Sequence, residues 1–281
     1  MKDELFSPKK KSGTRKNGNL WLAFFPSILC CLVFFSWFFV GSEAIASAAT
    51  FSEIENRGYL IVAVKDNLRP LGFRDESGNL QGWEIDLAKH LASDLLGKAD
   101  AVKFQPVSNQ DRLPSVFEQK VDLAIARVTA TESRSRLVSF SVPYYFDSTV
   151  LITKDPSIAQ LQDLSGRKIA VLNNSSTIAQ VKYFLPHAKL SGVDSYLEAR
   201  SQMENRAVDA FAADASVLSG WVQEYHQYKL IPTRLSTEPL SIVMPKGLQY
   251  VELRRKIDEA INRYTATAWL QKNSQKWKLL Y

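Results

Sequence analysis

The chain alternates strand-like and helix-like segments in two successive sets, and this order limits its possible folds more than any other feature. Residues 59–126 contain three short apolar runs separated by two amphipathic stretches, and residues 168–225 repeat the order. Strands that alternate with helices form parallel sheets through right-handed crossovers. We therefore predict an α/β protein built from two similar units.

Apolar spacing sets the expected elements. In the helix expected over residues 83–96, the side chains of Ile85, Leu87 and Leu91 fall near helical spacing. The first unit should also contain strands 59–64, 102–107 and 121–126 and a helix 108–117 capped by Ser108. The second unit should contain strands 168–172, 188–193 and 209–213 and helices 178–185, 195–206 and 215–225.

Two further strands imply how the units are joined. The remaining expected elements are strands 149–153 and 240–244 and terminal helices 248–264 and 266–279. A strand that leaves the first unit and another that returns imply two lobes on a two-segment hinge, with a ligand trapped between them. We expect the first lobe at 49–150 and 239–281 and the second at 151–238. One continuous sheet and two independent domains are the alternatives.

Residues 121–134 join a buried strand to a polar segment that contains Arg127, Thr129, Thr131 and Arg134. Thr131 can cap a short helical turn, which puts Arg134 one turn in. Polar groups at such a strand end lie at the carboxyl edge of the sheet, where α/β proteins bind ligands. Because Arg fits a carboxylate bidentately, we predict a small anionic or zwitterionic ligand. A surface Arg beside a capped turn is the alternative.

The second unit offers two features at its strand ends. The loop at residues 173–177 precedes a helix, so its N–H groups and the hydroxyls of Ser175, Ser176 and Thr177 suit an anion, although Ser176 could simply cap the helix. Asp214 has no adjacent cation in the sequence. A partly buried carboxylate without a partner is unfavourable, so a ligand ammonium would neutralise it, unless Asp214 caps the helix that it opens.

Arg134 for a carboxylate and Asp214 for an ammonium together describe an α-amino acid. Leaving either charge buried without its partner is unfavourable, which makes the pair specific for a zwitterion. Lys65 and Arg127 are then surplus positive charge that would suit an acidic ligand side chain, or they face solvent.

Composition excludes several other functions. Net charge is +6, but residues 1–18 hold six Lys or Arg and only two Asp or Glu, so the rest lacks the basic excess typical of nucleic-acid binding. His90, His187 and His226 have no metal-ligand spacing. No phosphate-binding glycine loop or nucleophile elbow is present. We expect no cofactor, no metal and no catalytic residue.

An uncharged segment, residues 20–41, follows the basic N-terminus and contains both cysteines. A basic start, an apolar core and the small-x-small triplet at 46–48 are typical of a secretion signal, and the core is also long enough to span a bilayer. Either form exports the remainder. We expect a periplasmic or exported protein, released by cleavage of residues 1–48 or anchored through residues 20–41, without disulfides.

Several motifs in the exported part resemble those of one family. They are GWEIDLAKHLA at 82–92, VDLAIARVTATESR at 121–134, FSVPYY at 140–145, DLSGRKIAVL at 163–172, RAVDAFAAD at 206–214 and Lys276-Trp277. From about residue 53 to residue 281 the chain resembles bacterial extracellular solute-binding proteins of family 3, the polar amino-acid receptors of ABC importers. The resemblance implies a two-lobed periplasmic-binding-protein-like (type II) fold, an amino-acid ligand, an ABC permease in the inner membrane as partner, and a monomer that performs no chemistry.

The resemblance also implies roles for individual residues. The Arg that matches Arg134 grips the α-carboxylate in this family, and the Asp that matches Asp214 grips the α-amino group. The Thr that matches Thr129 assists, as does the loop that matches Asn174, Ser175 and Ser176. We expect the same roles here.

The chain departs from the family pattern around the ligand side chain. Leu68 stands where an aromatic residue often covers the ligand, Arg127 where Gly or Ser is common, and Ser133 where Glu is common. Asn173-Asn174 replaces a Gly-containing pair. Lys65 resembles the glutamate-binding branch, which agrees with an acidic ligand. We therefore expect the two charge clamps to be kept and the side-chain pocket to be altered.

Two other functions fit the same scaffold. Some relatives of this family are dehydratases, so a dehydratase-like enzyme is one alternative. A ligand-sensing domain tethered to the membrane by residues 20–41 is the other.

Overall fold

The computed structural model describes residues 49–173 and 175–280. The predicted N-terminal segment, residues 1–48, and the site residue Asn174 lie outside the described residues. Of the helices in the described part, none is long and apolar enough to cross a membrane.

The first sheet has the strand order β5-β1-β6-β15-β7. Its strands are β1 (Leu60–Val64), β5 (Val102–Pro106), β6 (Leu123–Ile125), β7 (Ser139–Phe140) and β15 (Val243–Met244). Strands β5, β1 and β6 run parallel, and β15 joins antiparallel to both β6 and β7. The carboxyl ends of β1, β5 and β6 therefore share one edge of the sheet.

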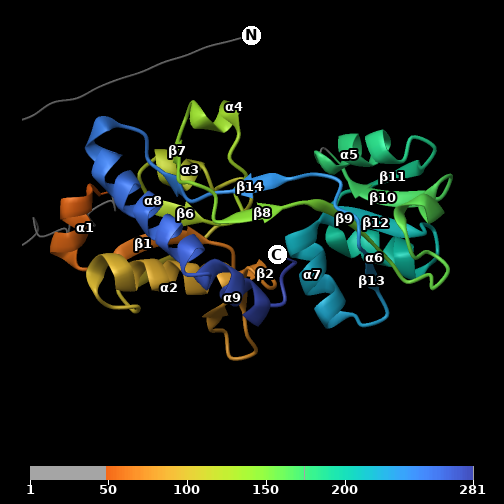
Figure 1. Ribbon diagram of the computed structural model, residues 1–281, viewed down its shortest axis with the longest axis horizontal. Helices are drawn as coiled ribbons and strands as arrows, with labels where there is room; N and C mark the ends of the chain where they lie inside the picture. The colour runs from red at the N-terminus through yellow and green to blue at the C-terminus, as the bar shows by residue number, and fades with distance from the viewer. Residues whose placement is uncertain (1–48, 174, 281) are drawn as a thin grey trace, which may run out of the picture. The chain divides into compact units, whose positions relative to one another are not determined.

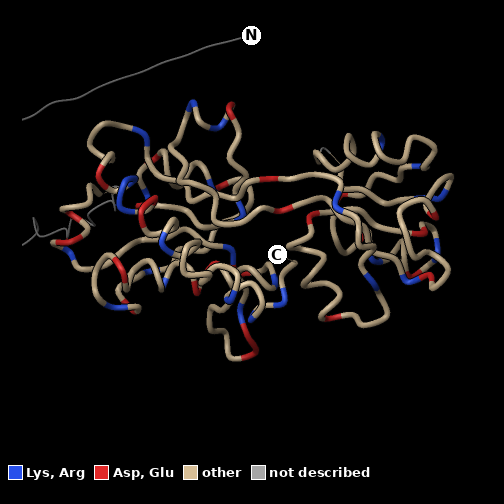
Figure 2. Tube along the Cα trace, in the orientation of Figure 1, with Lys and Arg blue, Asp and Glu red and all other residues tan. Residues whose placement is uncertain are grey.

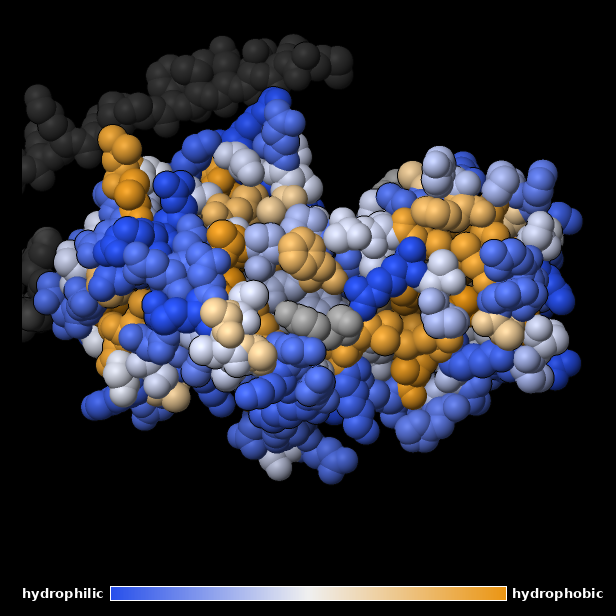
Figure 3. All heavy atoms as spheres, in the orientation of Figure 1, coloured by the Kyte–Doolittle hydropathy of each residue, from blue (hydrophilic) through white to orange (hydrophobic). Residues whose placement is uncertain are grey.

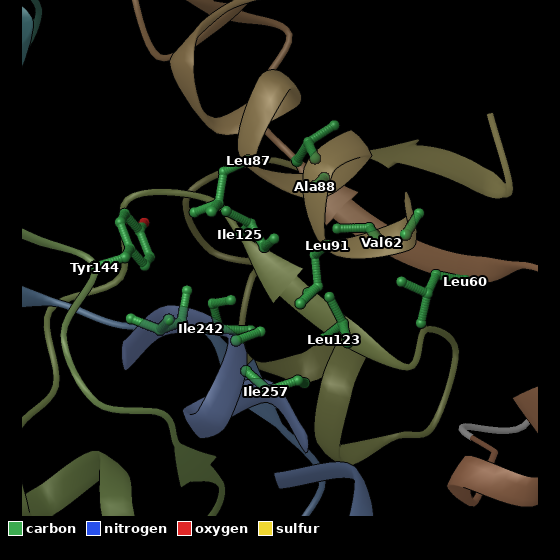
Figure 4. Packing of buried hydrophobic residues seen from close by; sticks show 14 of the residues in the cluster. Leu60, Val62, Leu87, Ala88, Leu91, Leu123, Ile125, Tyr144, Ile242 and Ile257 are labelled. Carbon is green, nitrogen blue, oxygen red and sulfur yellow. The ribbon is translucent and has the colours of Figure 1, made fainter. Parts of the chain in front are cut away.

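Helices accompany this sheet, and all of them except the short helix at residues 132–135 contribute buried side chains to the core. They are α1 (Phe51–Arg57), α2 (Trp83–Leu96), α3 (Pro114–Phe117), α4 (Glu132–Ser135), α8 (Val251–Ala266) and α9 (Trp269–Lys276). Figure 4 shows Leu87 and Leu91 of α2 and Ile257 of α8 packed with Leu123 and Ile125 of β6. All five side chains are fully buried, which fixes β6 and the segment that follows it.

The second sheet has the order β11-β10-β12-β9-β13. Its strands are β9 (Thr149–Thr153), β10 (Lys168–Leu172), β11 (Lys189–Val193), β12 (Ala210–Asp214) and β13 (Lys229–Ile231). The helices around it are η1 (Leu161–Leu164), α5 (Thr177–Phe184), α6 (Tyr196–Glu204) and α7 (Ala215–Glu224). Phe211 and Ala212 are neighbours in β12 but belong to two different hydrophobic clusters. Successive side chains of a strand point to opposite faces of the sheet, so the two clusters lie on opposite faces.

Two short strands connect the sheets: β8 (Tyr145–Asp147) carries the chain out and β14 (Glu238–Leu240) brings it back. They pair antiparallel, and Figure 1 shows them running between the sheets. A small sheet of β2 (Asn67–Leu68), β3 (Gly72–Arg74) and β4 (Leu80–Gln81) follows β1, and η2 (Leu248–Tyr250) precedes α8. The arrangement is the predicted α/β fold with one outward and one return connection.

The expected elements are mostly confirmed, and α2, β9 and β10 have the expected bounds. The helix expected from Ser108 is wrong in its start. The Ser108 hydroxyl accepts from the N–H groups of Gln110 and Asp111 and so caps a turn, while α3 begins at Pro114, which favours the first helical position. The helix α1 and the small sheet were not expected.

The single strand expected at 240–244 is also wrong, because this stretch contributes to two sheets. The hydroxyl of Ser141 accepts from the N–H of Ile242 at 2.9 Å, so a side chain takes the place of a strand partner there. Leu240 ends β14 and Val243 begins β15. The lobe boundaries 49–150, 151–238 and 239–281 stay a prediction.

Candidate functional site

Arg127 stands at the end of β6 and turns toward the second sheet. Its φ of +50° is left-handed, a conformation that a non-glycine residue adopts at an energetic cost. Its backbone N–H donates to Glu84 Oε1 at 2.7 Å, which holds this turn. The guanidinium forms an ion pair with Asp214, and the two side chains are only 16% and 17% exposed.

Asp214 ends β12 and occupies the N-cap position of α7, but its side chain makes no capping hydrogen bond. Its carboxylate instead accepts from Arg127 Nη1. The protein thus supplies a cation to Asp214, although none is adjacent to it in the sequence. Adjacency in sequence does not reveal a cation at the end of a strand in the other sheet.

Arg134 lies in α4, where the predicted capped turn is confirmed. Thr131 is the N-cap and accepts from the Arg134 N–H. The Arg134 guanidinium donates to the Thr129 carbonyl at 2.8 Å. Burial lowers the pKa of Arg134, Arg127 lowers it further, and Glu238 opposes the shift. Arg127 and Arg134 are thus electrostatic neighbours at the end of β6.

Lys65 is buried rather than turned to solvent, at 5% exposure. Its Nζ donates to the Val107 carbonyl at 2.8 Å, which links the ends of β1 and β5. Burial lowers the pKa of Lys65, and the charges of Arg112 and Arg127 add to the effect. Lys65 therefore belongs to the same group of cations.

Arg112 is a fourth member of this group and was not predicted from the sequence. It donates to the Ala126 carbonyl at 3.0 Å, beside Arg127. Burial, followed by the charges of Arg127 and Arg134, lowers the pKa of Arg112 to about 10, so it stays a cation at neutral pH. Its position after β5, whose end meets those of β1 and β6, is the signal that could have found it. We call Lys65, Arg112, Arg127 and Arg134 the cation cluster.

Glu84 is a buried carboxylate that binds the backbone of Arg127, a member of the cation cluster. It is fully buried and accepts from the Tyr144 hydroxyl at 2.6 Å as well as from the Arg127 N–H. Burial raises the pKa of Glu84, while these hydrogen bonds oppose the shift. Its Oε2 has no hydrogen-bond partner among the described residues. The position of Glu84 in the first turn of an amphipathic helix does not predict this role.

Acidic residues flank the cluster on the connections between the sheets. Figure 2 shows an acidic residue on each of β8 and β14, and these are Asp147 and Glu238. Asp147 is buried, and its two carboxylate oxygens accept from the N–H and the hydroxyl of Ser216. Both oxygens are therefore already hydrogen-bonded. Within the described residues no carboxylate lies within ion-pair distance of Lys65, Arg112 or Arg134.

The loop before α5 is less closely tied to the cluster. Ser175 donates to the Leu172 carbonyl at 2.7 Å, and Ser176 is the N-cap of α5 without a side-chain capping bond. No hydrogen bond among residues 49–173 and 175–280 joins either serine to Arg127 or Asp214. Their part in ligand binding stays a prediction.

A cavity of about 430 Å³ lies beside the cluster, between the small sheet and helices α6 and α7. Its lining includes Leu68 and Phe73 on one side and Tyr196, Trp221 and Tyr225 on the other. Burial raises the pKa of Tyr196, and the charges of Arg127 and Arg112 oppose the shift, so Tyr196 adjoins both features. Figure 3 shows hydrophobic surface gathered over α7. None of the cation cluster lines this cavity.

The donor set suits charged organic groups rather than a metal. Of the residues that the structure describes, no group of three His, Cys, Asp or Glu could hold a metal ion. Guanidinium and ammonium groups at converging strand ends bind carboxylates. Two sheets joined by two strands, with charged side chains meeting at their edges, define a two-lobed ligand-binding protein.

The chain belongs to the bacterial extracellular solute-binding proteins of family 3, which it matches over residues 60–279. It is 26% identical over 231 residues to the ABC transporter glutamine-binding protein GlnH of Bacillus subtilis (strain 168), covering 81% of this chain and 84% of that protein. The predicted family is confirmed.

Solved structures show the same fold. The cysteine-binding protein from Campylobacter jejuni superposes with a TM-score of 0.64 at 26% identity, covering 80% of this chain and 91% of that one. The ancestral amino acid-binding protein AncCDT-1, a precursor of cyclohexadienyl dehydratase, superposes with a TM-score of 0.65 at 27% identity, covering 82% and 99%. The predicted two-lobed type II fold is confirmed.

Proposed function

We propose that the protein is the receptor of an amino-acid ABC importer and that it binds a polar amino acid with an acidic side chain. One observation supports the preference for a ligand with an acidic side chain. Lys65, Arg112 and Arg134 converge at one sheet edge without an ion-pair partner in the described part of the chain. Buried cations without partners are unfavourable, so a ligand with two carboxylates stabilises the closed form more than a ligand with one.

Binding requires a rearrangement of one ion pair. Arg134 takes the α-carboxylate, and Asp214 takes the α-ammonium in place of Arg127. The released Arg127 guanidinium then takes the side-chain carboxylate together with Lys65 and Arg112. Arg127 Nε is buried without a hydrogen-bond partner among the described residues, and a carboxylate acceptor would satisfy it. Thr129, Asn174, Ser175 and Ser176 complete the proposed contacts.

The family supports the proposed partner and location. The relatives named above are amino-acid-binding proteins, one of them from an ABC transporter. In the proposal, the exported monomer binds its ligand in the periplasm, closes its two lobes and delivers the ligand to a permease in the inner membrane. It performs no chemistry and binds no nucleic acid.

A second candidate ligand is a dicarboxylate that has no α-ammonium. The ion pair between Arg127 and Asp214 favours it, because Asp214 then needs no cation from the ligand. Such a ligand would pair with Arg134, Arg112 and Lys65 and leave the ion pair in place.

Calorimetry on the exported protein separates these ligands. We expect glutamate or aspartate to bind with a micromolar dissociation constant, about −8 kcal/mol, and glutamine to bind more weakly. Glutarate, which has both carboxylates and no ammonium, should bind more weakly than glutamate. Tighter binding of glutarate than of glutamate would replace the first candidate by the second. Binding of neither acid would refute both.

A further inference from the structure

Asp122 is a buried carboxylate that lies outside the ligand site. It precedes β6, at the end of the strand opposite to Arg127, and it is fully buried. Oδ2 accepts from the Ile61 N–H at 2.7 Å and pairs with the Arg57 guanidinium. Oδ1 accepts from the backbone nitrogen of Ala49 at 3.1 Å. The carboxylate thus fixes three segments, one of which is the segment that begins at Ala49.

Ala49 is itself held in the fold. It is 6% exposed and belongs to the same hydrophobic cluster as Phe51 and Ile54. The next residue, Thr50, makes a capping box with Glu53 at the start of α1. A backbone nitrogen that is buried against a carboxylate is an unusual position for a residue close to a processing site, because such segments are commonly free of contacts.

The sequence places a processing site at the same point. Residues Ala46, Ser47 and Ala48 form the small-x-small triplet that ends the signal segment. Cleavage after Ala48 makes the nitrogen of Ala49 the amino terminus. An amide nitrogen offers Asp122 one neutral donor, whereas a terminal ammonium offers charged donors and adds an ion pair with the carboxylate.

We propose that the exported protein is cleaved after Ala48 and that the new α-ammonium of Ala49 docks on the buried carboxylate of Asp122. Cleavage then produces a released protein whose first residue is part of the fold. The same step removes residues 20–41, so the anchored form is the unprocessed precursor.

The charges around this site set its pH dependence. Asp122 and Arg57 form the adjacent ion pair, Glu53 accepts from the Thr50 N–H at 2.7 Å, and Lys256 lies over the Phe51 ring. In the proposal, the contact with Asp122 raises the pKa of the α-ammonium above its ordinary value of about 8, against the burial of Ala49 and the cations Arg57 and Lys256, which lower it. Its contribution to stability is therefore complete below pH 8 and is lost as the pH rises through the raised value.

The test uses the full precursor, expressed in a bacterium that exports it. Mass spectrometry of the purified exported protein should show Ala49 as its first residue. The pH dependence of reductive methylation should then give the α-amino pKa. We expect the folded protein to exceed the urea-unfolded protein by about one unit, and the Asp122→Asn variant to lose this difference. The matched control is Glu55→Gln, which changes an exposed carboxyl of α1, the helix that follows Ala49. This variant should keep the pKa difference.

Two results would overturn the proposal. One is an intact N-terminus, or a first residue other than Ala49. The other is an α-amino group that titrates at the same pH in the folded and the unfolded wild-type protein. The wild-type comparison stands even if Asp122→Asn does not fold.

Discussion

Arg127 and Asp214 form an ion pair that joins the two sheets, with the guanidinium at the end of β6 and the carboxylate at the end of β12. In the family pattern Asp214 is the residue expected to receive the ligand's ammonium. The protein therefore holds one of its own cations at the position that a bound amino acid would use. In the proposed binding mode, the ligand's side-chain carboxylate gives the displaced Arg127 another anion, which links acidic side chains to recognition at Asp214.

Replacing Arg127 by serine should weaken the binding of acidic amino acids without weakening the binding of neutral ones. Without the guanidinium, Asp214 is free for the ammonium of any amino acid, while an acidic side chain loses a partner. We expect glutamate affinity to fall by about 30-fold or more, since loss of a buried charge contact costs about 2–5 kcal/mol. Glutamine affinity should stay equal or rise. Calorimetry with both ligands measures the ratio.

Arg127→Lys is the matched control because it keeps the charge and loses the fork of donors. It should bind glutamate with an affinity between those of the wild type and Arg127→Ser. Equal losses for glutamate and glutamine in Arg127→Ser would show that Arg127 does not contact the ligand side chain.

Arg134→Ala and Asp214→Ala should each abolish amino-acid binding while the fold is kept. Both side chains lie at the rim of a sheet and not in a hydrophobic cluster, so their loss should leave the circular dichroism spectrum unchanged. Losing one partner of a buried charge pair costs about 3–5 kcal/mol, which moves a micromolar dissociation constant toward millimolar. Retained affinity in either folded variant would contradict the clamp assignment.

The strands, their alternation with helices and the sheet edge that carries the site could be predicted from the sequence, because apolar runs and strand-end polar residues are local signals. Arg127, Arg134 and Asp214 were found in this way. The pairing of Arg127 with Asp214 could not be predicted, since it joins residues 87 positions apart. Glu84 and Arg112 were missed for the same reason. Their roles depend on burial against segments that meet only in the folded chain.

Gly220→Ala should hinder closure without touching the cation cluster. A Cβ at position 220 would overlap with the carbonyl oxygen of Arg69, in the small sheet region of the other lobe. Relieving such an overlap costs about 1–3 kcal/mol, so ligand affinity should fall by about fivefold or more. In thermal unfolding without ligand, the free energy of unfolding should change less than the free energy of ligand binding does.

Glu224→Gln is the control for this variant, on the same helix. It removes the Arg69–Glu224 ion pair of 3.1 Å, whose side chains are 41% and 47% exposed. An exposed pair contributes at most about 1 kcal/mol, so affinity should change little. Wild-type affinity in Gly220→Ala would show that α7 and Arg69 do not approach in the ligand-bound form.

Glu84 should make stability fall as the pH rises above the ordinary carboxyl range. Its folded pKa is raised above the ordinary value of 4.5 by burial, so the folded state binds the proton more tightly than the unfolded state. Glu84 therefore favours folding most at low pH, and this contribution is lost as the pH rises from 4.5 through the raised pKa. Urea unfolding between pH 4.5 and pH 8 measures the slope.

The variant Glu84→Gln separates charge from hydrogen bonding. Its amide oxygen can still accept from the Tyr144 hydroxyl and the Arg127 N–H, so we expect a fold as stable as the wild type at pH 8, without this pH dependence. Glu84→Ala leaves both donors unpaired and should lose about 2–4 kcal/mol at every pH. Glu76→Gln, in an exposed turn, is the control and should keep the wild-type slope. A wild-type slope in Glu84→Gln would show that Glu84 does not titrate between pH 4.5 and pH 8.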